Sequence, residues 1–141
     1  MKDEIPDFSS HIDIEVPFHD VDSMRVVWHG HYTKYFELAR CKLLESFDYG
    51  YTDMFESGYS WPVVDMRLKY VKSAYFGQVI RVEASLKEWR YRLKINYRIT
   101  DAESGEKITS GYTSQVAIDL KTNEMCYQSP DVLAQRLGIE P

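Results

Sequence analysis

Apolar residues recur at helical spacing in one long stretch of this chain and at every second position in most of the rest. The helical stretch begins near residue 31, and its apolar positions are Tyr32, Tyr35, Phe36, Ala39, Leu43 and Phe47. These side chains share one face of a helix, and Leu38, Cys41 and Leu44 widen that face. We therefore expect a helix that other structure surrounds, and Gly50 suits the left-handed residue that would follow its end.

Four segments alternate apolar and polar residues with a period of two, which predicts half-buried strands: residues 12–18, 64–70, 80–87 and 93–100. A last long strand should follow the turn at residues 101–105 and run over about residues 106–120. The short links between the later segments favour antiparallel pairing. Pro17 cannot donate to a ladder, so the first strand should lie or end at an edge. Residues 51–61 should form a loop with at most one helical turn, and a short helix should begin at Pro130 and stop at Gly138.

This order of elements predicts an α+β protein in which an antiparallel sheet wraps one helix, as a single domain over residues 1–141. The net charge of −5 argues against nucleic acid as the partner. No apolar run reaches the roughly 20 residues of a membrane span, and the first residues lack the features of a signal peptide, so we expect a cytoplasmic protein that does not enter membranes. Cys41 and Cys126 should be free thiols. A single sheet around one helix leaves edges open, which favours a homodimer or homotetramer.

Aspartates stand just ahead of the predicted helix, in the segment from Phe18 to Tyr32. The segment contains Asp20-Val21-Asp22, then Val26-Val27, Trp28, His29 and Tyr32. The start of a helix offers backbone N–H groups without partners and an electropositive dipole end, so it can stabilise an oxygen that gains negative charge. A carboxylate beside such a site suggests acyl chemistry.

The segment and the helix after it resemble the signature of hotdog-fold acyl-CoA thioesterases, in the 4-hydroxybenzoyl-CoA thioesterase and YbgC-like group. The resemblance implies a hotdog fold, with a five-stranded antiparallel sheet wrapped around one long central helix and a short C-terminal helix. It implies hydrolysis of an acyl-CoA or acyl-carrier-protein thioester, with no cofactor. No metal is expected either, because the His residues lack paired ligand spacing with cysteines or an HExxH arrangement. By the same similarity, Asp22 corresponds to the catalytic carboxylate. A carboxylate can attack the thioester carbonyl or activate water, and the sequence leaves both routes open.

The resemblance also implies roles for the neighbours of Asp22. His29 is the second catalytic candidate, and the backbone N–H groups of His29, Gly30 and His31 are the expected oxyanion site. Asp20 should order the loop. The expected substrate-binding residues are Met24, Val27, Trp28, Tyr32, Tyr35, Phe36 and Lys72, although Tyr32 also fits a packing role. Basic residues that could meet CoA phosphates are Arg67, Lys69, Lys72, Arg90 and Arg92.

The chain departs from the pattern of that group at a few positions. Many members have a glycine pair after the second aspartate, where this chain has Met24 and Arg25, and His31 stands where Asn is usual. Losing glycine restricts the backbone, so no relative's substrate preference can be carried over. Two other functions stay open: a hotdog domain that binds acyl-CoA without catalysis, and a hotdog hydroxyacyl dehydratase.

Overall fold

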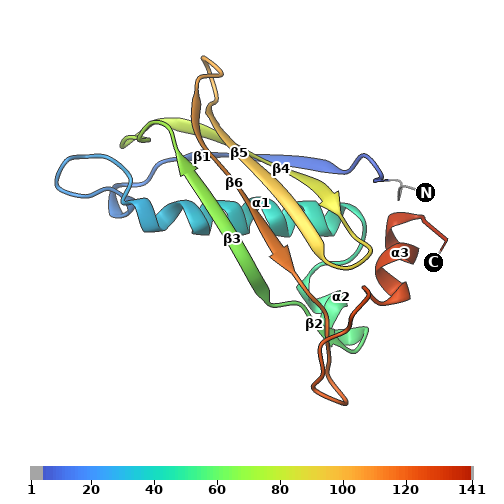
Figure 1. Ribbon diagram of the computed structural model, residues 1–141. Helices are drawn as coiled ribbons and strands as arrows, with labels where there is room; N and C mark the ends of the chain where they lie inside the picture. Colours follow the sequence, from blue (N-terminus) through green and yellow to red (C-terminus); the bar gives the residue numbers. More distant parts are fainter. Residues whose placement is uncertain (1–4, 141) are drawn as a thin grey trace.

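The computed structural model describes residues 5–140, which form a five-stranded antiparallel sheet with one long helix against its inner face (Figure 1). The strand order is β1-β4-β5-β6-β3, and all four pairings are antiparallel. The predicted hotdog architecture is therefore confirmed, and Pro17 follows an edge strand as expected. The strands are β1 (Ser9–Glu15), β3 (Val63–Tyr70), β4 (Val79–Glu88), β5 (Leu93–Asp101) and β6 (Lys107–Gln115).

The central helix α1 (Tyr32–Ser46) packs mainly on β1 and β4. Its inward side chains, such as Phe36 and Leu43, are fully buried. Along β4 every second residue from Ile80 to Leu86 is buried as well, as the period of two predicts. Helix and sheet together form one apolar core, whose members come from opposite ends of the sequence.

The smaller elements lie at the end of the molecule where α1 ends (Figure 1). The helix α2 (Tyr51–Glu56) follows α1, and the helix α3 (Asp131–Leu137) lies near the chain's C-terminus. A two-stranded ribbon pairs β2 (Tyr59–Ser60) with β7 (Ile118–Asp119). Gly138 has φ 78° and ends α3 as predicted, while Pro130 stands just before the first helical residue.

Three predicted boundaries were wrong. The first strand runs from Ser9 to Glu15 instead of over residues 12–18, because Phe18 begins a 3₁₀ turn that ends at Asp20. The left-handed residue after α1 is Asp48, with φ 57°, whereas Gly50 has φ −64°; short polar side chains tolerate that region better than most residues. The last strand does not run unbroken to residue 120, because after Gln115 the backbone bonds elsewhere: the Val116 N–H donates to the carbonyl of Pro62.

The inner face of the sheet is covered on one side and open on the other. α1 lies over β1 and β4, but the edge strand β3 has almost no buried residue. Its apolar side chains Val64, Met66 and Tyr70 are 57%, 44% and 50% exposed. We call this exposed β3 side the open half of the sheet, and the part under α1 the covered half.

Two further properties concern the chain as a whole. Cys41 and Cys126 are both free thiols, as predicted. Within residues 5–140, no helix is both long and apolar enough to cross a membrane.

Candidate active site

The segment between β1 and α1 folds back on itself as a short antiparallel loop. Val21 and Val27 pair in an isolated bridge. At the tip, the Asp22 N–H donates to the Val26 carbonyl and the Arg25 N–H donates to the Asp22 carbonyl, both at 2.9 Å. Arg25 closes the turn with φ 63°, in the left-handed region that favours glycine. The position where the resembled group has glycine thus keeps the conformation that glycine would adopt most easily.

Asp20 anchors this loop to the helix. Its side chain is 1% exposed, and its two oxygens accept hydrogen bonds from Lys34 Nζ and from the Tyr35 hydroxyl, each at 2.6 Å. Burial alone would raise the pKa of Asp20, but these two hydrogen bonds outweigh it and hold the pKa below its usual value. The Asp20 carbonyl also accepts from the Trp28 N–H at 3.1 Å. These contacts agree with the prediction that Asp20 orders the loop.

Asp22, two residues later, is in the opposite environment. Its side chain is exposed, and one carboxylate oxygen accepts a hydrogen bond from the Met24 N–H at 2.8 Å. No hydrogen bond joins it to His29 among the described residues. The turn therefore presents the carboxylate to solvent in a fixed backbone frame, with its second oxygen available to a reactant.

The helix start offers donors near this loop. A 3₁₀ turn, His29–His31, leads into α1. The His31 N–H is bonded to the Trp28 carbonyl at 2.9 Å, whereas the N–H groups of His29 and Gly30 donate no hydrogen bond within residues 5–140. Of the three predicted oxyanion donors, His29 and Gly30 are thus free to bind an oxygen. A Cβ at Gly30 would lie 2.3 Å from the Trp28 ring, so a side chain there would displace this half-exposed ring.

An open hollow of about 210 Å³ lies beside the helix start. It brings together three of the predicted substrate-binding residues, Val27, Tyr32 and Lys72, with the catalytic candidate His29. The Tyr70 hydroxyl donates to the His29 carbonyl at 3.1 Å and joins the end of β3 to the helix start. The remaining lining residues are Tyr70, Val71 and Ser73. The sequence pattern did not single out these three, because only the folded sheet brings the end of β3 to this place.

The other predicted substrate-binding residues lie outside this hollow. Tyr35 and Phe36 point into the core and are 1% and 0% exposed. Met24 is 78% exposed at the loop tip, and Trp28 is half exposed over Gly30. Tyr32, which does line the hollow, is almost fully buried, and its hydroxyl accepts a hydrogen bond from the Ala74 N–H at 3.0 Å. Its contacts therefore fit the packing role.

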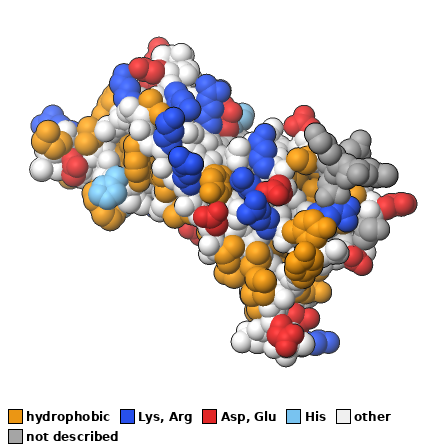
Figure 2. Space-filling model, viewed as in Figure 1, with side chains coloured by type: hydrophobic (Ala, Val, Ile, Leu, Met, Phe, Trp, Pro, Cys, Tyr) orange, Lys and Arg blue, Asp and Glu red, His pale blue; other side chains and the backbone are white. Residues whose placement is uncertain are grey.

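The predicted basic residues are spread over the sheet and its loops. Lys72 lines the hollow, but its ammonium group pairs with Glu106 at 2.7 Å, in an exposed ion pair that raises the pKa of the lysine. Arg92 pairs with Glu88 at 3.0 Å. Arg67 and Lys69 are exposed on β3 and have no ion pair within residues 5–140. Figure 2 shows Lys and Arg side chains gathered over the strands on the side facing the viewer.

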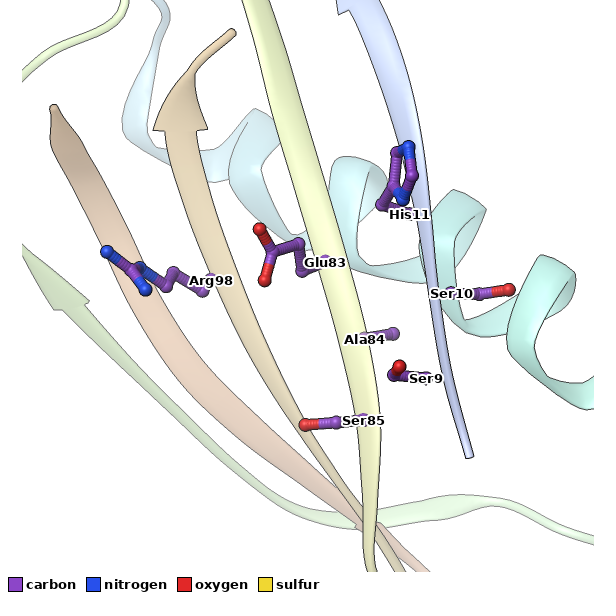
Figure 3. Close-up of a pocket in the computed structure, with 7 residues that line it drawn as sticks. All are labelled: Ser9, Ser10, His11, Glu83, Ala84, Ser85 and Arg98. Carbon is purple, nitrogen blue, oxygen red and sulfur yellow. The ribbon is translucent and has the colours of Figure 1, made fainter. Parts of the chain in front are cut away.

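A second hollow, of about 250 Å³, lies on the sheet over β1, β4 and β5 (Figure 3). His11, Glu83 and Arg98 line it and stand in register across the three strands. None of its residues belongs to the loop of Asp22. Across residues 5–140, no three His, Cys, Asp or Glu side chains converge on a possible metal site.

Comparison with known proteins matches residues 16–136 to the family described as the Thioesterase-like superfamily. The Synechocystis protein "Putative esterase sll0410" is 31% identical over 125 residues, which cover 88% of this chain and 75% of that protein. Among solved structures, the DHNA-CoA thioesterase of Staphylococcus aureus is 30% identical with a TM-score of 0.76, covering 84% of this chain and 80% of that one. Protein TT1821 of Thermus thermophilus is 28% identical with a TM-score of 0.81, covering 92% and 97%.

Proposed function

Because the chain belongs to the Thioesterase-like superfamily, we propose that it hydrolyses acyl-CoA or acyl-carrier-protein thioesters to a free acid and a thiol. Within the superfamily, the loop sequence from Asp20 to Tyr32 favours the 4-hydroxybenzoyl-CoA thioesterase and YbgC-like branch. A relative of 30% identity that is named for DHNA-CoA supports a CoA thioester as the substrate.

The observation that carries this proposal is the contrast within the loop: Asp20 is buried and bonded, while Asp22 is exposed on a tight turn. A buried aspartate with two partners is needed to hold the loop and is not accessible to a substrate. Asp22 has a free oxygen, and the adjoining helix start has two free N–H donors on His29 and Gly30. A carboxylate and an oxyanion site together can catalyse thioester hydrolysis.

In the proposed reaction, the thioester carbonyl oxygen accepts hydrogen bonds from the N–H groups of His29 and Gly30. In one route, Asp22 takes a proton from water while the water oxygen attacks the carbonyl carbon. The tetrahedral intermediate then collapses, the C–S bond breaks, and the proton passes to the leaving sulfur. In the other, Asp22 itself attacks, the thiolate leaves, and water hydrolyses the resulting anhydride. His29 would assist by orienting the water or the substrate from the edge of the hollow.

We further propose that the protein acts as a homodimer or homotetramer in which a second copy covers the open half of the sheet. Val64, Met66 and Tyr70 form an exposed apolar row along an edge strand, which is unfavourable for an isolated chain. The hollow at the helix start also borders this row through Tyr70. A partner there would enclose the substrate between two chains.

The test is thiol release from a panel of aliphatic and aromatic acyl-CoAs, measured for the wild type and for Asp22→Asn. We expect the wild type to hydrolyse part of the panel and Asp22→Asn to lose at least about a hundredfold in kcat, as removal of an acid–base group typically does. Asp7→Asn, an exposed aspartate outside the loop, serves as the control and should keep full activity.

Undiminished activity in Asp22→Asn would rule out Asp22 as the catalytic carboxylate. Tight binding of CoA esters without hydrolysis by the wild type would contradict the enzymatic proposal and favour a protein that binds acyl-CoA without catalysis.

A further inference from the structure

Arg40 is a buried cation that pairs with no carboxylate among the described residues. It lies in the middle of α1 and is only 8% exposed. Its Nε donates to the Tyr51 hydroxyl at 2.7 Å and its Nη1 donates to the Tyr97 hydroxyl at 3.3 Å. Within residues 5–140, no aspartate or glutamate forms an ion pair with it. Burial disfavours its charge, but the two phenol oxygens more than offset this and raise the pKa of Arg40 above its usual value.

The cluster around Arg40 has more donors than acceptors. A guanidinium group carries five N–H donors, and the two phenols accept from only two of its nitrogens. The Tyr97 hydroxyl can donate its own proton to Thr113 Oγ1, which lies 2.6 Å away. The Tyr51 hydroxyl has no acceptor among the described residues. The Tyr51 side chain is 39% exposed, and no unpartnered nitrogen of Arg40 is fully buried. The remaining donors therefore reach solvent, where they can meet an additional oxygen acceptor, preferably an anionic one.

The position of Arg40 on the helix places the cluster beside the open half of the sheet. Lys42 marks the β1 side of α1, because its ammonium group bonds the His11 carbonyl at 3.0 Å. Arg40 is on the opposite edge of the buried face and contacts β5 through Tyr97. Thr113, the next group in the network, is in register with the exposed Met66 of β3. The cluster therefore ends one strand away from the exposed apolar row.

The same edge of the helix leads back to the hollow. Tyr32, Phe36 and Arg40 follow one another at intervals of four residues, so they lie along one line of α1. Tyr32 lines the hollow, and Phe36 stacks on Tyr97 at 4.4 Å between ring centroids. Eight residues of helix span about 12 Å, so Arg40 lies about that far along α1 from Tyr32 at the hollow. An acyl group held at the helix start and extended along the open half would approach the guanidinium with its far end.

We propose that Arg40 determines specificity by selecting acyl groups whose far end carries an oxygen acceptor, above all a carboxylate. This inference rests on the proposed thioesterase function and adds to it the class of acyl group. A chain that ends in a methyl group would displace water from the remaining donors of Arg40 and Tyr51 without replacing its hydrogen bonds. A chain that ends in a carboxylate would satisfy them with a charge-assisted hydrogen bond.

The test compares length-matched pairs of substrates: adipoyl-CoA with hexanoyl-CoA, suberoyl-CoA with octanoyl-CoA, and sebacoyl-CoA with decanoyl-CoA. For the pair of the right length, we expect the wild type to prefer the carboxyl-ended ester by about 10- to 100-fold in kcat/KM, the effect of one hydrogen bond to a charged group. Arg40→Met should abolish or reverse this preference while it retains hydrolysis of the methyl-ended ester. Arg40→Lys should keep part of it.

Lys42→Met is the matched control, because it removes a cation from the other edge of the same helix and should leave the preference unchanged. Equal preference ratios in the wild type and Arg40→Met would overturn the proposal. So would an Arg40→Met protein that loses its oligomeric state but not its preference, since Arg40 would then serve assembly.

A binding measurement tests this inference separately from the proposed function. Calorimetry measures the affinity of the same esters for Asp22→Asn and for the double variant Asp22→Asn/Arg40→Met. Tighter binding of the carboxyl-ended ester that depends on Arg40 would support the inference even if the wild type hydrolysed nothing. Binding that does not depend on Arg40 would overturn it.

Discussion

The covered and open halves of the sheet have the same backbone pattern but differ in what lies against their inner faces. In the covered half, α1 buries Ile80 and Val82 completely. In the open half, Met66 and Val64 follow similar alternation and remain about half exposed. One chain thus buries the inward residues of β4, β5 and β6 but leaves those of β3 exposed. The difference teaches that a strand with an apolar row is not always part of the chain's own core, and the open half is where we propose that a partner and a substrate bind.

The largest effect should come from a core residue of the covered half. Leu43→Ala removes a fully buried side chain that packs between α1 and the sheet, and should lower the free energy of unfolding by about 2–5 kcal/mol. Denaturant unfolding measures this loss, which should be independent of protein concentration. A cost below about 1 kcal/mol would mean that the helix does not cover the sheet as described.

The link between the loop and the covered half gives the next effect. Asp20→Asn weakens two hydrogen bonds to a buried carboxylate and should cost about 1–3 kcal/mol of unfolding free energy at pH 7. Because the folded pKa of Asp20 lies below the unfolded value of about 3.9, its contribution is present above that pH and is lost as the pH falls through the folded pKa. Unfolding curves of both proteins from pH 7 to pH 3 test this. The wild type should lose more stability on acidification than the variant, and parallel losses would contradict the role of Asp20.

A charge in the open half should act on association more than on folding. Met66→Asp puts a carboxylate into the exposed apolar row of β3 and should weaken the proposed subunit contact at least tenfold, or about 1.4 kcal/mol. Sedimentation equilibrium measures the association constant. Ser9→Asp, an exposed position on the other edge strand, should leave association unchanged. If both variants behave alike, the two edges do not differ as we describe.

The smallest effect should come from the turn that holds Asp22. Arg25 has φ 63°, so Arg25→Gly relieves backbone strain and should stabilise the fold by roughly 0.5–1 kcal/mol after the larger chain entropy of glycine is counted. Thermal unfolding detects the gain, and Arg25→Ala, which keeps a Cβ, should show none. A gain of the same size for alanine would exclude strain as its cause.

The sequence predicted the fold well where local periodicity decides it. Strand β4 and helix α1 lie where their patterns place them, because the apolar face of each is buried in the same chain. The break after Gln115 was not predictable, since it depends on a hydrogen bond to distant Pro62. The left-handed residue after α1 is Asp48, whereas glycine's conformational freedom had favoured Gly50.

The candidate site was predictable only as far as its local loop. Asp20, Asp22 and His29 are close in sequence, so a motif can indicate them together. Tyr70 and Ser73 join the hollow through strand pairing, which no local pattern reports. Arg40 stands on the buried face of an apolar helix, where periodicity gives no reason to expect a cation.

The central claim is that a second copy completes the open half and that activity depends on it. Analytical ultracentrifugation over a dilution series, with thiol release measured on the same samples, tests this most directly. We predict an active particle of at least twice the 16.6 kDa of one chain, whose activity per chain falls as dilution separates the copies. A single chain of 16.6 kDa that retains full activity per chain would contradict the account.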